Sequence, residues 1–348
     1  MMRLGFKAWL SDAFHAIRYA SRHHQPWQPH FVDGATQHES RELIIKRCER
    51  IIGSTTETVR IKGHPEIGAI RSMFAEQLRD DLTGATPRAV ESARTLASLD
   101  MGDSEAFELF CGTFEMSNLQ ALEAARKTLA PFVILHMSCL PRLERAAEST
   151  ASFCFRSAEV SNIYVVGGGS VGKFGFDADR MMLIVPEDDG YSGLAEKVIA
   201  AFAFLRCCPQ VKVVLKIDDD HRLLSPHELR QLFLRAMRSK VAAVFGRIND
   251  AVALGAHNRV WHFGKTGQDV LECRPHTIAG ATRFVSGSAG YLINRAALQT
   301  FFWSYVYFRD QIAAGLYEDQ TISDFLERQG GRLIDVDIAR AVSAVASY

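Results

Sequence analysis

Apolar residues recur at two different spacings along this 348-residue chain. Before about residue 130 they follow the period of three to four residues that is typical of helices, as at Ile70, Met73, Phe74 and Leu78. After that point, short runs of apolar and β-branched residues predict buried strands. The predicted strands are Phe132–His136, Ile163–Val166, Met181–Val185, Val213–Ile217, Ala242–Phe245 and Phe284–Val285.

Segments with helical spacing alternate with these strands, which predicts an α/β fold with a mainly parallel sheet flanked by helices. These segments are Leu143–Phe153, Ser192–Leu205 and Pro226–Arg238. The change of pattern predicts two regions, a helical N-terminal region over 1–130 and an α/β domain over 131–348. In a domain of this kind, ligands bind beyond the carboxyl ends of the strands.

Composition excludes some partners. The 40 Lys and Arg residues balance 40 Asp and Glu residues, so the chain lacks the basic excess of a nucleic-acid-binding protein, and we expect no nucleic-acid partner. No run approaches the roughly 20 apolar residues of a transmembrane helix. The seven cysteines form no C-x-x-C pair, and their odd number indicates a reducing compartment.

The first residues of the chain are amphipathic, with Arg3, Lys7, Arg18 and Arg22 beside apolar residues such as Trp9. A basic helix of this kind is an expected site of peripheral contact with an anionic membrane. The alternative is a helix that packs on its own domain. The segment is too interrupted by polar residues for a signal peptide. We therefore expect a cytoplasmic protein, in which this helix either packs on its own domain or makes peripheral contact with the inner membrane.

The predicted strand Val213–Ile217 is followed at once by three carboxylates, Asp218, Asp219 and Asp220. Three like charges at a strand end repel one another unless a positive group lies beside them. A divalent cation with oxygen ligands is the natural partner, and a nucleotide diphosphate can complete its coordination. The alternative is a solvated acidic turn.

Two later segments change the balance between these interpretations. Ser286–Gly290 is a turn of small residues, whose glycines allow a ligand or a neighbouring backbone to come close. Glu318 and Asp319 lie directly before a helix-like pattern. Taken alone, the first segment is also explained by an ordinary loop. The second is also explained by an acidic helix N-terminus, which the helix dipole favours.

In this order, the three segments resemble the β-1,3-glycosyltransferase family, which includes galactosyltransferases and Fringe-type enzymes. The family's K-x-DDD motif is matched by Lys216–Asp220, its glycine-rich segment by Gly287–Leu298, and its acidic segment by Glu318–Thr321. The resemblance extends from about Phe132 to the C-terminus. A fourth match lies upstream, where the family's D-x-Y-x-N-L-T-x-K stretch is matched at Asp189, Tyr191, Leu194 and Lys197, while Gly193 and Ala195 replace its Asn and Thr.

The resemblance implies a GT-A type nucleotide-sugar-binding domain and an inverting transfer. The enzyme would move a hexose or N-acetylhexosamine from a UDP-sugar to a hydroxyl of a glycan or lipid-linked oligosaccharide, with Mn²⁺ (or Mg²⁺) as cofactor. Eukaryotic relatives are membrane-anchored in the secretory lumen. This chain lacks that anchor, so we expect a bacterial enzyme of polysaccharide biosynthesis.

The same resemblance assigns candidate site residues. Asp319 would be the catalytic base, and Glu318 would contact the acceptor or cap the helix. The family's late metal-binding histidine has no counterpart after His276, so Asp335 or Asp337 is a candidate substitute, or else the diphosphate and water supply the remaining ligands. The metal ligands are then Asp218, Asp220 and Asp337. The donor-binding residues are Lys197, Asp218, Asp219, Gly287 and Ser288, together with Ser138 and Arg142, which lie where the end of the first predicted strand would meet the nucleotide. For Arg142, a surface ion pair is the alternative.

Three other functions compete with this one. Gly167–Gly172 reads GGGSVG after a predicted strand, which is the outline of a dinucleotide fingerprint and implies an NAD(P)-binding oxidoreductase. The continuation Lys173–Arg180 is too short and too broken for the helix that this fingerprint needs. A glycan-binding protein of the same fold could keep the carboxylates without catalysis. A metal-dependent phosphohydrolase also clusters aspartates, but its further ligands are not evident.

Overall fold

The computed structural model describes residues 40–54, 65–153, 155, 158–169, 172–250, 283–315 and 317–344. These residues belong to one compact unit. The N-terminal segment for which we expect membrane contact lies outside the described residues. Within them, no helix is both long enough and apolar enough to cross a membrane.

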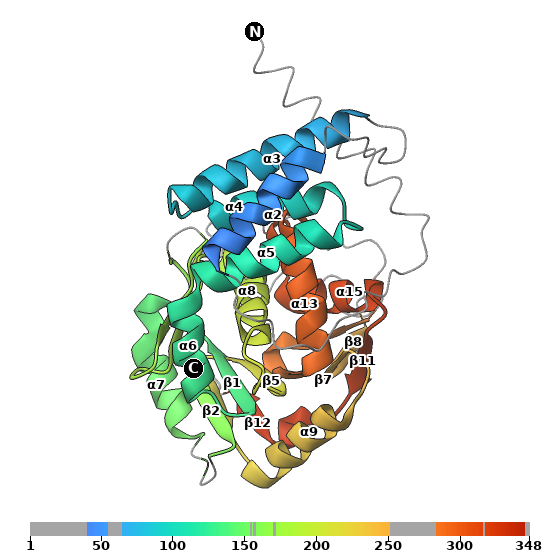
Figure 1. The fold of residues 1–348 in the computed structure, drawn as a ribbon. Coiled ribbons are helices and arrows are strands. Elements are labelled where there is room, and N and C mark those ends of the chain that lie inside the picture. The colour runs from blue at the N-terminus through green and yellow to red at the C-terminus, as the bar shows by residue number, and fades with distance from the viewer. Residues whose placement is uncertain are drawn as a thin grey trace. The chain divides into compact units, whose positions relative to one another are not determined.

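A mixed sheet forms the centre of the described fold, and it confirms the predicted α/β class (Figure 1). Six of its strands run in one direction, while β10 and β3 run opposite to them. The strand order is β11-β7-β10-β5-β1-β2-β4-β3. The strand bounds are β1 Phe132–Met137, β2 Val160–Val166, β3 Gly175–Asp177, β4 Met182–Ile184, β5 Val213–Asp218, β7 Ala243–Gly246, β10 Tyr291–Asn294 and β11 Arg332–Asp335.

The central strands are buried on both faces, which explains their continuous apolar runs. Along β1, side chains alternate between two hydrophobic clusters. Val133 and Leu135 point into one cluster, and Phe132 and Ile134 into the other. The first cluster lies against α8 (Leu194–Arg206), α13 (Arg295–Tyr307) and α15 (Glu318–Arg328), and the second against α9 (Pro226–Arg238).

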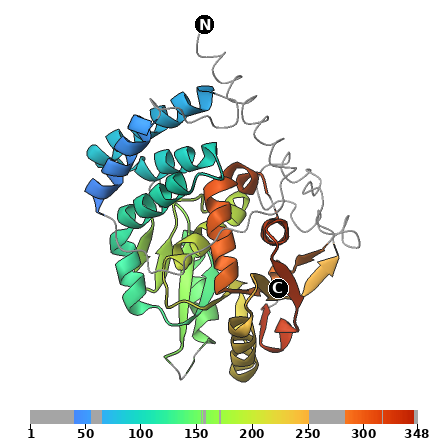
Figure 2. The same cartoon turned by 45° about the vertical axis from the view of Figure 1, so that its right-hand side comes forward.

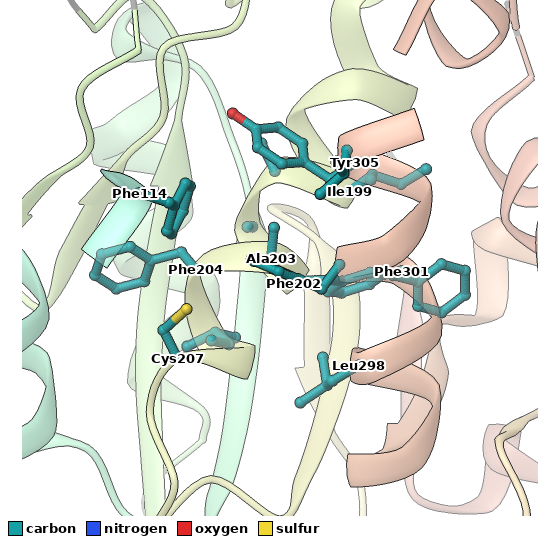
Figure 3. Packing of buried hydrophobic residues seen from close by; sticks show 14 of the residues in the cluster. Phe114, Ile199, Phe202, Ala203, Phe204, Cys207, Leu298, Phe301 and Tyr305 are labelled. Carbon is teal, nitrogen blue, oxygen red and sulfur yellow. The ribbon is translucent and has the colours of Figure 1, made fainter. Parts of the chain in front are cut away.

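Helices α8 and α13 pack against each other on one face of the sheet, as both ribbon views show (Figures 1 and 2). Their contact is largely aromatic. Phe202 and Phe301 lie with ring centroids 5.3 Å apart, and the α13 residue Tyr305 packs near Phe114 on the neighbouring helix α5 (Ser104–Ser117) (Figure 3). Rings of this size supply much of the buried apolar area, and their tilted and edge-on arrangements are the preferred ones.

The N-terminal helices share this core. They are α2 (Arg41–Ser54), α3 (Pro65–Thr83), α4 (Ala89–Leu99), α5 (Ser104–Ser117) and α6 (Leu119–Thr128). The predicted helical stretch Ser104–Leu129 is broken at Asn118. Its side-chain amide donates to the Phe114 carbonyl and its Oδ1 accepts from the Phe174 N–H, which joins the helix break to the sheet domain. The predicted boundary near residue 130 falls between α6 and β1.

Two short ribbons complete the described fold. The pair β6 (His221–Leu223) and β12 (Val342–Ala344) returns the C-terminal segment to the strand that follows the three aspartates. The pair β8 (Ile248–Asp250) and β9 (Arg283–Val285) takes up the predicted strand Phe284–Val285, which therefore lies outside the main sheet. Short connecting helices are η1 Leu140–Arg142, α7 Leu143–Ala151, η2 Tyr191–Gly193, η3 Gly287–Ala289, α14 Arg309–Ala313 and η4 Ile338–Arg340.

Candidate active site

The candidate site lies where β5 ends, at the carboxyl edge of the parallel strands. The apolar residues of β5 place it at the centre of the sheet, between β1 and β10. Because β10 is antiparallel, its first residue, Tyr291, pairs with Lys216 near the end of β5. The turn η3 before β10 therefore reaches the same edge as Asp218. The sheet topology thus brings two of the predicted segments together.

Lys216 connects the three aspartates to the later acidic segment. Its ammonium is almost fully buried, at 1% exposure, and lies 2.9 Å from Asp218 Oδ1 and 3.2 Å from Glu318 Oε2. The two carboxylates raise the pKa of Lys216 above its ordinary value against the opposing effect of burial. Lys216 therefore remains a cation and holds one carboxylate of each segment.

Glu318 is bonded through both of its oxygens. One accepts from Lys216, and the other accepts from the Tyr291 hydroxyl on β10. The side chain keeps only 4% of its exposure. A carboxylate enclosed in this way is placed to fix the start of α15.

Asp319 is the partly exposed carboxylate of the acidic segment. Its Oδ2 accepts from the Gly287 N–H at 3.1 Å, and its Oδ1 from the Gln320 N–H at 2.9 Å. Burial, helped by the neighbouring Glu318, raises the pKa of Asp319 to about 7. A carboxylate with this pKa is suited to accept a proton near neutral pH.

Two glycines of the small-residue turn allow this approach. A Cβ on Gly287 would lie 3.2 Å from Glu318 Oε2 and 3.3 Å from the Asp319 Cβ. Gly290 has φ +75°, and a Cβ there would lie 2.6 Å from a methyl carbon of Ile217 and 2.8 Å from the Lys216 carbonyl oxygen. The turn is therefore glycine-rich because it packs directly on the end of β5 and on the acidic segment.

The middle aspartate has a different environment from its neighbours. Asp219 is buried, accepts from the Ser138 hydroxyl at 3.0 Å and pairs with Arg142 at 2.8 Å. Burial raises its pKa, and the Arg142 guanidinium opposes that rise. Ser138 and Arg142, both predicted to lie near the donor, thus reach the aspartate cluster from the end of β1.

Asp220 faces the helix α7 and the strand β6. Arg145 Nη2 lies 3.4 Å from its Oδ2, and His221 Nδ1 lies 3.3 Å from its Oδ1. The neighbouring His221 is the first cause of the lowered pKa of Asp220. His221 Nε2 also lies 3.0 Å from the carbonyl oxygen of Ser288, so this imidazole links the aspartate cluster to the turn η3.

Lys197 lies beneath the site. Its buried ammonium donates to the Ser138 carbonyl at 2.7 Å and to Asp189 Oδ1 at 3.1 Å. Asp189 also accepts from the backbone N–H groups of Leu140 and Gly167, at 2.7 and 2.6 Å. Lys197 therefore supports the loops after β1 and β2, and its predicted direct contact with the donor stays a prediction.

Tyr191 brings the upstream motif to the same place. After burial, the largest causes of its raised pKa are the charges of Asp218, Asp319 and Glu318. Of the four matched segments, each therefore contributes a residue to this edge of the sheet.

Two of the three aspartates have the exposure and the oxygen atoms that a divalent cation needs. Asp218 and Asp220 keep 41% and 26% side-chain exposure, and their oxygens are the ligand type that Mg²⁺ and Mn²⁺ prefer. In the described part of the chain, no three His, Cys, Asp or Glu residues are grouped to hold a metal. Magnesium is commonly bound by one or two carboxylates together with substrate phosphates and water, and the two aspartates fit a site of that kind.

Asp337, the candidate third ligand, follows β11 and pairs with Arg340 at 2.8 Å on the exposed surface. Its role as a metal ligand stays a prediction.

The GGGSVG segment does not have the geometry of a dinucleotide site. The N–H groups of Gly167, Gly168 and Gly169 already donate to Asp189 Oδ1, the Glu187 carbonyl and the Val185 carbonyl, at 2.6, 2.7 and 3.0 Å. The described chain then continues into β3, whereas the fingerprint opens a helix whose N-terminus meets the pyrophosphate.

Sequence reasoning did not single out Arg145, His221 or Tyr291 as site residues. No motif marks Arg145, because its proximity to Asp220 depends on where α7 packs. His221 directly follows the three aspartates, and Tyr291 stands in the glycine-rich match, so both carried a positional signal.

A scan against protein-family models finds no matching family, and a search of curated proteins finds no significant match.

Proposed function

We propose that this protein is an inverting glycosyltransferase with a GT-A type domain, which moves a hexose or N-acetylhexosamine from a UDP-sugar to a hydroxyl of a glycan acceptor. One observation carries the proposal. Three segments that resemble the β-1,3-glycosyltransferases are far apart in the sequence but lie in contact in the fold. Lys216 contacts Glu318, and Gly287 contacts Asp319. If Asp218–Asp220 were only a solvated acidic turn and Glu318 and Asp319 only a helix cap, contact between the two segments would not be expected.

The residue roles follow from charge and exposure. Asp319, with its pKa near 7, would accept the proton of the acceptor hydroxyl as that oxygen attacks the sugar carbon from the face opposite the leaving group. Asp218 and Asp220 would hold Mn²⁺ or Mg²⁺, whose chemistry is to neutralise the charge on a departing diphosphate.

Two arginines at the same edge suit an anionic donor. Arg142 and Arg145 each use one nitrogen for an aspartate, and their half-exposed guanidinium groups keep further donors. These remaining donors would contact phosphate oxygens of the nucleotide. Ser138, at the end of β1, lies where the nucleotide would enter the site.

The sheet itself favours this proposal over an oxidoreductase. A dinucleotide-binding sheet is mostly parallel, and an antiparallel strand in such a fold commonly lies at its edge, whereas here the antiparallel β10 lies inside the sheet, between β5 and β7. The raised pKa of Asp319 favours catalysis over glycan binding alone, because a binding surface needs no proton acceptor. A lipid-linked oligosaccharide acceptor and a role in bacterial polysaccharide biosynthesis are part of the proposal.

A donor screen tests the proposal. The full chain is incubated with a panel of UDP-hexoses and UDP-N-acetylhexosamines, with Mn²⁺ or with excess EDTA, and the release of UDP is measured. We expect release from at least one donor with Mn²⁺ and its loss with EDTA. A GDP-sugar is the matched negative control. No release from any UDP-sugar, in protein that is folded, would contradict the proposed function.

A further inference from the structure

We propose that Lys216 and Tyr291 are positioning residues for the transfer reaction. They hold Glu318 in place and thereby fix Asp319, the proposed base, relative to Asp218 on the donor side. This inference rests on the proposed function, and it adds a division of roles in which Glu318 positions and Asp319 reacts.

Lys216 connects the two halves of the site. Its ammonium touches one residue of each half of the site, with 2.9 Å to Asp218 and 3.2 Å to Glu318. Lys216 and Asp218 are two positions apart on β5, so their side chains leave the strand on the same face. Lys216 is therefore a direct link between the rigid centre of the sheet and the start of α15.

Tyr291 holds Glu318 from the neighbouring strand β10. The ladder of β10 and β5 pairs it with Lys216, and its ring lies 5.6 Å from the Lys216 ammonium. Its hydroxyl donates to the Glu318 oxygen that Lys216 does not use. Glu318 is thus held from two adjacent central strands, and its rotation is excluded as long as both partners remain.

The burial of the Lys216–Glu318 ion pair is not explained by stability alone. An ion pair withdrawn from water costs desolvation, and apolar residues of similar size often serve stability as well or better. Lys216 and Glu318 are nevertheless almost fully buried, with side-chain exposures of 1% and 4%. The burial of this pair is explained if it fixes the orientation of Glu318. A carboxylate held by an ion pair and by a second hydrogen bond has one arrangement.

The position of Glu318 determines the position of Asp319. Glu318 and Asp319 are the first two residues of α15, so the backbone that Glu318 holds is the backbone that carries Asp319. Asp319 in turn accepts from Gly287, in the turn that precedes β10. A loosened Glu318 therefore displaces the base, and displacement by about 1 Å can cost a reaction about 10²-fold.

The test compares turnover with nucleotide binding in single variants of the full chain. Tyr291→Phe removes only the hydroxyl, and we expect kcat to fall about 10-fold while the Kd for UDP with Mn²⁺ stays within about 2-fold. Lys216→Met removes the ammonium, and we expect a loss of about 10²-fold in kcat, of which Lys216→Arg restores a part. Tyr307→Phe is the control, since in the described structure that buried hydroxyl has no hydrogen-bond partner.

A double variant separates positioning from general destabilisation. Because both side chains act through Glu318, Tyr291→Phe combined with Glu318→Gln should be no slower than Glu318→Gln alone. Additive losses, or an unchanged kcat in folded Tyr291→Phe and Lys216→Met, would overturn the positioning role while leaving the transferase proposal intact. A wild-type chain that transfers no sugar would instead refute the proposed function and, with it, this inference.

Discussion

The ammonium of Lys216 lies 3.2 Å from the carboxylate of Glu318, although the two residues are 102 positions apart in the sequence. This buried contact joins the strand that carries the three aspartates to the helix that carries the proposed base. It makes the proposed donor side and the proposed acceptor side of the site parts of one arrangement.

The base assignment predicts the effect of Asp319→Asn. General-base catalysis contributes about 10²–10⁴-fold, so the transfer rate should fall on that scale. Affinity for UDP with Mn²⁺ should stay unchanged, because the proposal gives Asp319 a role toward the acceptor and none toward the nucleotide. Initial rates and calorimetric binding measure the two effects. Asp324→Asn, on the same helix, is the control and should keep a rate near that of wild type.

The pKa of Asp319 predicts a pH dependence with a definite sign. Since the ionised form is the base, kcat/KM should fall as the pH drops below about 7. Between about pH 4 and pH 7 the folded state holds a proton that the unfolded state releases. The free energy of unfolding should therefore decrease as the pH rises through that window. Asp319→Asn should lack this decrease, and a variant with the same pH profile as wild type would contradict the assigned pKa.

Asp219 and Asp220 should differ when each is replaced by alanine. Asp219→Ala removes the acceptor of the Ser138 hydroxyl and the partner of Arg142, so we expect the free energy of unfolding to fall by about 1–3 kcal/mol. Asp220→Ala removes a partly exposed side chain, so we expect a smaller loss of stability and the loss of UDP–Mn²⁺ binding. Denaturation and binding measured on both variants test this, and the reverse pattern would contradict it.

Gly290 should tolerate no side chain. Its φ of +75° is costly for other residues, and the added Cβ of Gly290→Ala would lie 2.8 Å from the Lys216 carbonyl oxygen. Strain at such positions costs about 1–3 kcal/mol, so a clear drop in Tm is expected. In Gly53→Ala the added Cβ meets nothing within 4 Å inside helix α2, so this control should leave the Tm unchanged or raise it. An equal Tm for the two variants would refute the packing of the turn on β5.

Lys197→Met should reveal whether this residue acts from beneath the site. The variant leaves Asp189 without its cation and the Ser138 carbonyl without its donor. We expect a lower Tm together with a higher Kd for UDP, because the loop from Ser138 to Arg142 loses its support. A higher Kd with an unchanged Tm would instead indicate a direct contact between Lys197 and the donor.

Much of the fold follows from local patterns in the sequence. The strands β1, β2, β5 and β7 and the helix α9 are where apolar periodicity predicts them, because long buried runs and a Ser225 cap before Pro226 are strong local signals. The short strands β3, β6, β8 and β12 were not predicted, since three residues show no period and pair only when tertiary contacts bring a partner.

The candidate site was also predictable only in part. Residues within motifs, such as Asp218 and Asp319, were found because the motif fixes their spacing. The partners of these residues come from distant elements, so the contact of Arg145 with Asp220 and that of Tyr291 with Glu318 depend on packing, although Tyr291 itself stands in the glycine-rich match. The repulsion among the three aspartates led to the prediction of a divalent cation beside them. In the fold, Lys216, Arg142 and Arg145 are protein cations that also lie beside these aspartates.

The most direct measurement of the account is nucleotide binding to the wild-type chain, followed as the shift in Tm and by calorimetry. We predict stabilisation by UDP with Mn²⁺, worth about 2.7 kcal/mol at 100 times the Kd, its loss in Asp220→Ala, and no stabilisation by NAD. Stabilisation by NAD, or by neither nucleotide, would contradict a UDP-sugar site at the three aspartates.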